Sequence, residues 1–226
     1  MAAGEGLRLR PLTESWPKPL LPIDGRPVIA TVLRALADGG CTTATVVTGH
    51  LADALEALVG DGGFGIEIRF ARQPRPDGSA DAVARGLDAG AEPPLLVATA
   101  DTVFRSGDVG RFARAFDASS PPGAVAIRHD PPPGGTRGAV EVRDGVVRRI
   151  VAAAETPFAH ASLWGLGREL VPYLERLPGP PYELAHAYQR AIDDGLAVSA
   201  FEVGRTRDLT DPLDLVKENF PYLSYD

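Results

Sequence analysis

The chain has 226 residues, 44% hydrophobic and 23% charged, which is enough for one sizeable α/β domain and argues against disorder. Its net charge of −7 excludes the broad basic surface that nucleic-acid partners require. A single cysteine, the lack of a membrane-length apolar run and the lack of a signal-peptide pattern argue against an oxidising compartment and a membrane partner, so we expect a cytoplasmic protein.

Helices and strands are expected to alternate over the first 130 residues. Pro27 begins a helical pattern that Gly39 ends, and Ser79 is placed to cap a helix that follows it. Further helices are expected over 51–59 and 109–116, and strands over 43–48, 66–70, 95–98 and 124–127. Such alternation predicts a mostly parallel sheet with helices on both faces.

The pattern changes after three consecutive prolines at 131–133. Two apolar runs, 138–142 and 146–151, flank Arg143-Asp144-Gly145 and predict a β-hairpin that forms an antiparallel flap. Helices around 169–177 and 182–194, a strand over 198–203 and a last helix from residue 212 complete the chain. We expect one domain, with a core over 1–130 and a flap and closing segment over 131–226.

The amino-terminal segment is rich in glycine. Gly4 and Gly6 flank one residue, and this spacing lets backbone N–H groups approach an anion closely. Arg8 follows two residues later and can add a bidentate phosphate contact. The alternative is a flexible amino terminus. The next segment opposes that alternative, because Pro17 and Pro19 hold Lys18 between them, which suits a fixed electrostatic role.

These two segments together resemble the sugar-phosphate nucleotidyltransferase superfamily, whose members make NDP-sugars from an NTP and a sugar 1-phosphate. The resemblance runs from Ala2 to Pro27 almost without a gap. Three further segments are similar to family motifs: Gln73 with residues 77–82, residues 98–101 ending in Asp101, and residues 208–215 beginning at Asp208.

The resemblance implies a Rossmann-like three-layer α/β sandwich of the GT-A-like type, and a transfer of a nucleoside monophosphate to a phosphorylated acceptor. It assigns catalytic roles to Arg8, Lys18 and Asp101, and a shared Mg²⁺ to Asp101 and Asp208. It also implies that Gly138 and Glu155 contact the acceptor. Many members form dimers or tetramers, so the resemblance is compatible with a homo-oligomer. The implied nucleotide contacts are Ala2, Ala3, Gly4, Glu5, Gly6, Arg8, Lys18, Gln73, Gly78 and Ser79.

The chain departs from the family pattern in two places. Family members begin with a strand that leads into the glycine-rich loop, and here Met1 stands where that strand should end. Either translation starts upstream or the protein is structurally impaired, and we favour an upstream start. The family also carries a lysine after the hairpin, which contacts the sugar phosphate, and residues 150–157 contain none.

Two other functions stay open at this point. One is a non-catalytic nucleotide-sensing module of the same fold, and the other is the same transfer to a non-sugar phosphorylated acceptor. Each predicted site residue also has a structural alternative: Asp101 could cap a turn, and Asp208 with Asp211 could begin the last helix. Retention of Arg8, Lys18, Asp101 and Asp208 favours the enzyme, since fold stability does not need them.

Overall fold

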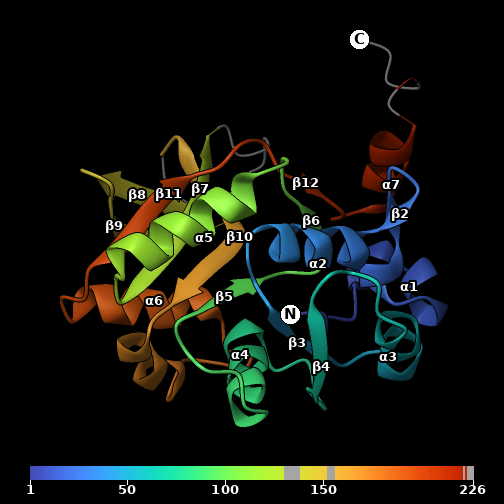
Figure 1. The fold of residues 1–226 in the computed structure, drawn as a ribbon, viewed down its shortest axis with the longest axis horizontal. Coiled ribbons are helices and arrows are strands. Elements are labelled where there is room, and N and C mark those ends of the chain that lie inside the picture. Colours follow the sequence, from blue (N-terminus) through green and yellow to red (C-terminus); the bar gives the residue numbers. More distant parts are fainter. Residues whose placement is uncertain (130–137, 152–155, 221, 223–226) are drawn as a thin grey trace.

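We analysed a computed structural model that describes residues 1–129, 138–151, 156–220 and 222 (Figure 1). Glu155, predicted to contact the acceptor, lies outside the described residues. No helix in the described ranges is long and apolar enough to cross a membrane.

The core of the molecule is a mixed sheet of six strands, flanked by a smaller parallel pair. The six strands lie in the order β5-β10-β7-β11-β9-β8. Their bounds are β5 Leu95–Ala98, β7 Gly123–His129, β8 Ala139–Arg143, β9 Val146–Val151, β10 Phe158–Leu166 and β11 Val198–Glu202. The parallel pair is β3 (Thr43–Thr48) with β4 (Glu67–Arg72). Two short pairs, β1 (Pro22–Ile23) with β2 (Arg26–Pro27) and β6 (Thr102–Val103) with β12 (Arg207–Asp208), complete the strands of the described residues.

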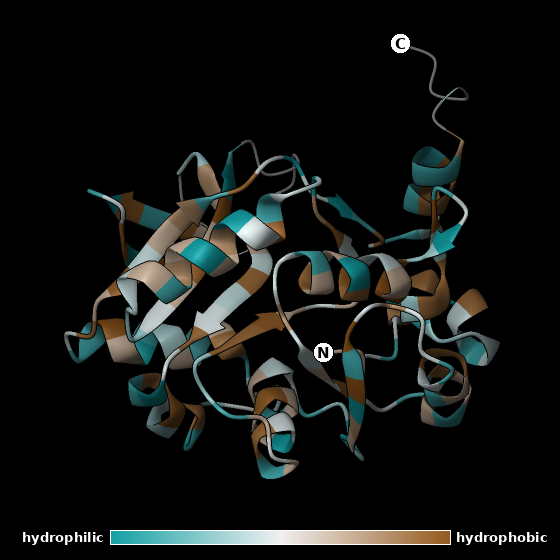
Figure 2. Cartoon of the chain, in the orientation of Figure 1, coloured by the Kyte–Doolittle hydropathy of each residue, from teal (hydrophilic) through white to brown (hydrophobic). Residues whose placement is uncertain are grey.

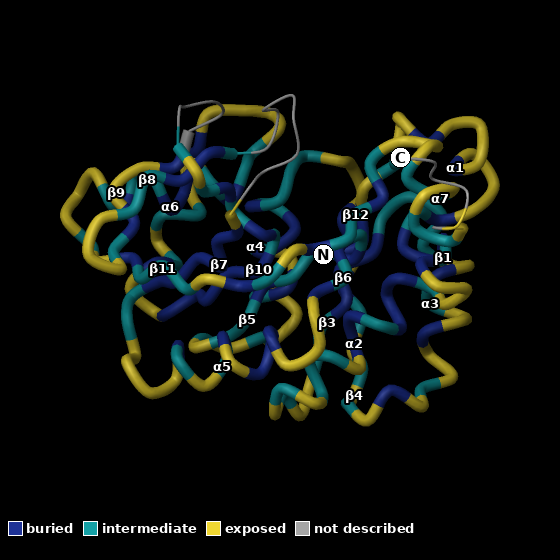
Figure 3. Tube along the Cα trace, turned by 90° about the horizontal axis from the view of Figure 1, so that it is seen from above, coloured by how far each residue is buried: buried dark blue, intermediate teal, exposed yellow. Residues whose placement is uncertain are grey.

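Helices cover both faces of the sheet, which confirms the three-layer α/β class. Along β7, Ala124 and Ala126 pack against α5, whereas Val125 and Ile127 pack on the opposite face against α6. The helices are α1 Leu12–Ser15, α2 Val28–Asp38, α3 Ala52–Gly60, α4 Ser79–Asp88, α5 Asp108–Ser119, α6 Leu184–Asp193 and α7 Pro212–Asn219. In Figure 3 the strands run through the buried centre while the outer turns of the helices are exposed.

The prediction of a mostly parallel sheet is wrong in detail. β3–β4 and β7–β11 are parallel, but β10 runs antiparallel to both β5 and β7. The reason is a strand that the sequence pattern did not reveal: β10 follows the hairpin and inserts between β5 and β7. The hairpin itself is confirmed, with Asp144 and Gly145 at φ of 54° and 73°, as a two-residue turn of this kind requires.

Two local predictions also need correction. The segment expected as a helix around 169–177 is a 3-10 helix, η3 (Arg168–Leu174), and it contains Pro172, which cannot donate an α-helical hydrogen bond. Ser79 does not cap its own helix, because α4 begins at Ser79 with Gly78 in the cap position. Two more 3-10 turns, η1 (Leu7–Leu9) and η2 (Lys18–Leu20), shape the amino-terminal segment.

The first two residues lie between the parallel pair and the large sheet. The Met1 ammonium donates to the Ala98 carbonyl at 2.7 Å, and the Ala100 N–H donates to the Met1 carbonyl at 2.9 Å. On the other side, the Ala2 N–H donates to the Val47 carbonyl at 2.8 Å. Met1 and Ala2 thus link β3 to β5, at the point where the family pattern led us to expect the end of the first strand.

Candidate functional site

A cavity of about 600 Å³ opens at the carboxyl ends of β4 and β5. Three chain segments line it: the amino-terminal loop, the segment after β4 beginning at Gln73, and residues 99–101 after β5. Lys18, Glu183 and Thr210 complete the wall. Ligand sites in open α/β sheets lie at this edge, so the fold places the cavity where such a protein binds its ligand.

The amino-terminal loop is held in a fixed shape. Thr13 Oγ1 donates to the Gly6 carbonyl at 2.9 Å, and the Leu9 N–H donates to the same carbonyl at 2.8 Å. Gly6 has φ +64°, and a Cβ there would lie 2.9 Å from Thr13 Cγ2. Glycine is therefore required at this position both by conformation and by space.

This loop offers free donors to the cavity. In the described part of the chain, the N–H groups of Gly4, Glu5 and Gly6 donate to no other protein atom. Arg8 lines the same cavity and is exposed, and it forms no ion pair with any described residue. N–H groups without a protein acceptor, beside a guanidinium without an ion-pair partner, have the chemistry that suits a phosphate group. Glu5, also predicted to contact the nucleotide, does not itself line the cavity.

Lys18 and Asp101 form an ion pair at the floor of the cavity. Lys18 Nζ lies 2.5 Å from Asp101 Oδ2, and the two side chains are 14% and 33% exposed. Burial opposes ionisation of Asp101, but the charge of Lys18 and hydrogen bonds from Lys18, Thr99 and Thr102 outweigh it, so the pKa of Asp101 lies below its ordinary value. Asp101 therefore carries a negative charge at neutral pH.

Asp208 lies next to Asp101 although the two are far apart in sequence. β12 pairs with β6 so that Asp208 faces Thr102, and the Thr102 hydroxyl lies 2.7 Å from Asp208 Oδ1 and 3.3 Å from Asp101 Oδ1. Arg128 Nη1 lies 3.2 Å from Asp208 Oδ2. One hydroxyl thus touches both carboxylates, which brings together the two residues predicted to share a metal ion.

The donor set at this point is small but suitable for Mg²⁺. Two carboxylates supply hard oxygen ligands, and Mg²⁺ often takes only one or two of these from a protein. Asp101 lines the cavity, whereas Asp208 does not, and Asp208 Oδ2 accepts from Arg128 and Thr206. The described residues contain no group of three or more potential metal-ligating side chains, so a dedicated protein cage is not formed among them. Lys18 and Arg128 partly neutralise the two carboxylates.

The segment after β4 is fixed by internal bonds. Gln73 Nε2 donates to the Gly78 carbonyl and to Asp81 Oδ2, both at 2.9 Å. Gly78 has φ +112°, and a Cβ there would lie 2.4 Å from the Tyr182 carbonyl oxygen, so no other residue fits without displacing the backbone. Both hydrogen bonds of the Gln73 amide nitrogen stay within the protein, and the side chain is buried.

Ser79 joins this segment to α6. Its hydroxyl donates to Glu183 Oε2 at 2.5 Å and accepts from the Leu184 N–H at 2.8 Å. Ser79 therefore satisfies the first N–H of α6 rather than that of α4, which corrects the predicted cap. Glu183 also lines the cavity, and the sequence pattern contained no signal for it. Thr99 and Thr210 were missed as well, although Thr99 lies inside the segment that ends in Asp101.

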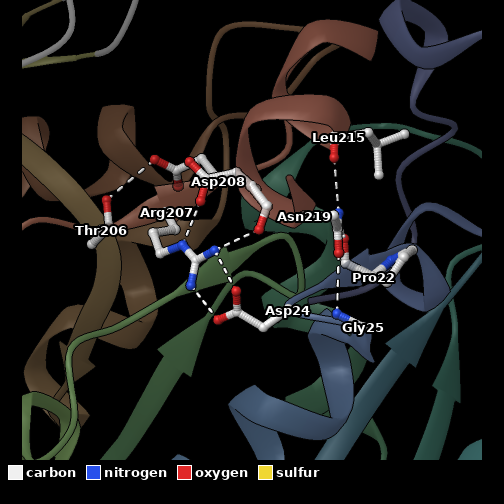
Figure 4. A network of polar contacts seen from close by, with 9 residues as sticks. Pro22, Asp24, Gly25, Thr206, Arg207, Asp208, Leu215 and Asn219 are labelled. Carbon is white, nitrogen blue, oxygen red and sulfur yellow. Dashed lines mark hydrogen bonds and ion pairs between the residues drawn. The ribbon is translucent and has the colours of Figure 1, made fainter. Parts of the chain in front are cut away.

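Asp211, not Asp208, begins the last helix. Asp211 Oδ1 accepts from the N–H groups of Leu213 and Asp214, and the Asp214 side chain accepts from the Asp211 N–H, which is a complete capping box. Arg207 points from β12 toward Asp24 and α7, as Figure 4 shows. Asn219 in turn links α7 to the β1–β2 turn through Pro22 and Gly25.

Most predicted nucleotide contacts come together in one place. The predicted nucleotide contacts that line the cavity are Ala2, Ala3, Gly4, Gly6, Arg8, Lys18, Gln73, Gly78 and Ser79. Asp101, predicted as a catalytic residue and metal ligand, lines it as well. Gly138 does not line it: this residue precedes β8, and its carbonyl accepts from the His160 N–H at 3.1 Å. The acceptor role of Gly138 therefore stays a prediction.

Comparison with known proteins was made on both sequence and structure. Two relatives are a glucose-1-phosphate thymidylyltransferase of Streptomyces antibioticus, 28% identical over 97% of this chain and 64% of the relative, and a CMP-5'-(3-aminopropyl)phosphonate synthase of Streptomyces rubellomurinus, 31% identical over 93% of this chain and 35% of the relative. The chain thus spans less than two thirds of either relative.

Among solved structures, a putative glucose-1-phosphate thymidylyltransferase from Bacillus anthracis matches with a TM-score of 0.85 and 20% identity, over 100% of this chain and 94% of that one. This match establishes a shared fold. The family model described as Nucleotidyl transferase matches residues 1–157, which include the amino-terminal loop, Lys18, Gln73 and Asp101. The chain therefore belongs to the nucleotidyl transferase family.

Proposed function

We propose that this protein transfers a nucleoside monophosphate from an NTP to a sugar 1-phosphate, giving an NDP-sugar and pyrophosphate. The observation that carries the proposal is the convergence, in one cavity, of the Gly4 and Gly6 N–H groups, Arg8 and the Lys18–Asp101 pair. Among the described residues the two N–H groups have no acceptor and Arg8 forms no ion pair. Family membership and the named activity of the Streptomyces antibioticus relative support it.

The chemistry needs charge stabilisation and alignment rather than a protein nucleophile. An oxygen of the acceptor's phosphate attacks the α-phosphorus, a new P–O bond forms, and the bond to the β-phosphate oxygen breaks with that electron pair leaving on pyrophosphate. Negative charge grows on the α-phosphate and on pyrophosphate. We assign the loop N–H groups and Arg8 to the triphosphate, and Lys18 to the α-phosphate.

Magnesium is part of the proposal. Asp101 and Asp208 would hold Mg²⁺, which would supply neutralising charge to the triphosphate when bound. Lys18 keeps Asp101 ionised, and Thr102 holds both carboxylates in place. Ionised, positioned carboxylates are what a hard cation requires, because a protonated carboxyl is a poor ligand.

The base is assigned to the segment after β4. Gln73 Oε1 would accept a hydrogen bond from a base N–H, and the backbone at Gly78 would lie along the base edge. For the acceptor we propose a sugar 1-phosphate, with Gly138 and Glu155 on its side. The phosphonate named for the second Streptomyces relative makes a non-sugar phosphorus acid the alternative acceptor.

Pyrophosphate release tests the proposal. The protein is incubated with Mg²⁺, one of five NTPs (the four ribonucleotides or dTTP) and one of a panel of sugar 1-phosphates and alkyl phosphonates. Lys18→Met is compared with Lys217→Met, because the chain has only these two lysines and Lys217 is exposed on α7. We expect release that needs one NTP and one acceptor, that Lys18→Met lowers at least about 100-fold, and that Lys217→Met leaves unchanged.

Three results would count against the proposal. Release that is equal in the two lysine variants would remove Lys18 from the site. Pyrophosphate formed without an acceptor would indicate NTP hydrolysis. NTP binding by calorimetry with no release on any acceptor would favour the nucleotide-sensing module.

A further inference from the structure

His50 contacts the chain on both sides of residues 4–12, the part of the amino-terminal loop that contains Gly4 and Gly6. It lies in the turn between β3 and α3 and is half-buried. Its backbone N–H donates to the Ala3 carbonyl at 3.3 Å, just before these residues. Its ring Nε2 lies 2.7 Å from the Thr13 carbonyl oxygen, just after them. A single residue from another part of the sequence therefore holds the loop at both ends.

Residues 4–12 have few apolar contacts to hold their shape. Leu9 is the one buried residue among them. By contrast, β5, which leads to Asp101 in the same cavity, is hydrophobic along its whole length (Figure 2). A segment that buries little apolar surface opens easily unless hydrogen bonds close it. The conformation of residues 4–12 therefore depends on their polar contacts.

The ring of His50 is the donor in its contact with Thr13. A carbonyl oxygen can only accept, so the hydrogen is on Nε2. Thr13 is buried and continues the contact toward the loop, because its hydroxyl donates to the Gly6 carbonyl at 2.9 Å. The Leu9 N–H donates to the same carbonyl at 2.8 Å. His50 thus reaches Gly6 through one residue, Thr13.

The turn before α3 fits closely against the loop. A Cβ at Gly49 would lie 2.7 Å from the Ala3 carbonyl oxygen, so the backbones touch here. Gly4 and Gly6 line the cavity, and among the described residues their N–H groups have no acceptor. Because Ala3 and Thr13 border this part of the loop, a shift of either would move these N–H groups relative to a bound phosphate.

We propose that His50 is a positioning residue for the nucleotide. Its ring holds Thr13, and through Thr13 it keeps the N–H groups of Gly4 and Gly6 arranged for the triphosphate. His50 does not line the cavity, so it acts through the loop and not by touching the substrate. The inference rests on the proposed function for the identity of the ligand. A loop that is ordered before binding gains affinity, because less conformational entropy is lost when the NTP arrives.

Two substitutions of His50 isolate the hydrogen bond to Thr13. In His50→Gln the amide nitrogen is as many bonds from Cα as ring Nε2 is, and it can still donate. In His50→Asn the nitrogen lies closer to the main chain and does not reach. His186→Asn is the matched control, because His186 is exposed on α6.

NTP binding without an acceptor is measured by calorimetry. We expect His50→Asn to weaken the affinity about tenfold, as the loss of one hydrogen bond predicts, and His50→Gln to weaken it by no more than about twofold. His186→Asn should leave it unchanged.

Steady-state kinetics distinguishes positioning of the nucleotide from a general loss of structure. We expect His50→Asn to raise the KM for the NTP about tenfold, while kcat and the KM for the acceptor change less than about threefold. A partly unfolded enzyme would instead show a lower kcat with both KM values unchanged.

Exchange of the Leu9 amide hydrogen, followed by NMR, gives a readout that does not depend on catalysis. This N–H donates to the Gly6 carbonyl, which Thr13 also holds. We expect its exchange to be about tenfold faster in His50→Asn than in His50→Gln.

Equal NTP affinities in His50→Gln and His50→Asn, or equal exchange of the Leu9 amide, would overturn the proposal. A lower kcat with an unchanged KM for the NTP would overturn it too. If His50→Asn fails to fold, Thr13→Val and Thr13→Ser repeat the comparison, since only serine keeps the hydroxyl that donates to Gly6. Weaker NTP binding in the valine variant alone would then support the proposal, and equal binding would overturn it.

Failure of the proposed function has a different signature. An unaltered protein that binds NTP but releases no pyrophosphate on any acceptor would overturn the transfer reaction alone. The affinity and exchange measurements need no acceptor, so they would still decide whether His50 positions the loop.

Discussion

At the scale of single residues, the arrangement around Lys18 and Asp101 links stability to charge. Each side chain is largely withdrawn from water and has the other as its partner. Removing one member of such a pair is more harmful than removing both, because the remaining charge is left without compensation. Hydrogen bonds link Asp101 to three further polar groups beside the ion pair, which are Thr99, Thr102 and the Asp208 carboxylate.

We expect Lys18→Met to lower the free energy of unfolding by about 1–2 kcal/mol and to raise the pKa of Asp101. In the native protein that pKa is depressed, so the pair contributes stability above the ordinary carboxyl pKa and loses it as pH falls. Urea denaturation measures the free energy of unfolding, and carbon-detected NMR titration measures the pKa of Asp101. Lys18→Met/Asp101→Asn should recover most of the lost stability. A further loss in the double variant would show that the pair is not coupled.

Gly78 is the second point at the residue scale. Gly78→Ala should lower NTP affinity by at least about tenfold, because the new Cβ would collide with the Tyr182 backbone and move the loop beside Gln73. Calorimetry with the preferred NTP measures the affinity of each variant. Gly90→Ala is the control: Gly90 also has positive φ, at +91°, but its surroundings are open and it lies outside the cavity. Equal affinities in both variants would contradict the assignment of this loop.

Individual site residues could be predicted because they belong to contiguous motifs. The motifs are defined by local spacing, and most residues of the loop from Ala2 to Arg8 line one cavity together with Lys18, Gln73 and Ser79. Glu183 could not be predicted in this way. It enters the wall through a hydrogen bond to Ser79, more than a hundred positions away, and nothing in its local sequence marks that contact.

At the scale of elements, strand β10 shows where periodicity fails. Three of the nine residues of β10 are alanine or glycine, which are depleted in strands, and they break up the run of large apolar side chains. A register shift between His160 and Trp164, with Ser162 at φ +61°, also interrupts the alternation, so that Leu163 and Trp164 are both buried. The last helix was predictable, by contrast, since Asp211, Pro212 and Asp214 form a start signal within four residues.

The cap of α7 gives a prediction at this scale. Asp211→Ala should destabilise the protein by about 1 kcal/mol, since two backbone N–H groups lose their acceptor. Asp88→Ala is the matched control, because Asp88 is an exposed aspartate at the end of α4 that accepts no side-chain hydrogen bond among the described residues. Chemical denaturation measures the free energy of unfolding of both variants. Equal values would show that the capping box makes no measurable contribution to stability.

At the scale of the whole molecule, the site depends on the sheet. Asp101 follows β5 and Asp208 lies on β12, and only the pairing of β12 with β6 brings them to one hydroxyl. Strands of two other sheets hold the amino-terminal loop, since Met1 bonds to β5 and Ala2 bonds to β3. The sequence pattern could not predict the pairing of β12 with β6, and only the resemblance to a family led us to expect Asp101 and Asp208 in one place.

The central claim is that the cavity beside Lys18 passes the nucleotidyl group of an NTP to a phosphorylated acceptor. Its most direct test follows two labels with Mg²⁺ and the acceptor that releases pyrophosphate: NTP labelled with ³²P at the α-phosphate, and the same NTP labelled at the γ-phosphate. We predict that the α-label appears in a nucleotide-linked acceptor and the γ-label in pyrophosphate, and that Lys18→Met abolishes both while Lys217→Met abolishes neither. A γ-label recovered as inorganic phosphate, or an α-label that never leaves the nucleotide, would contradict the account.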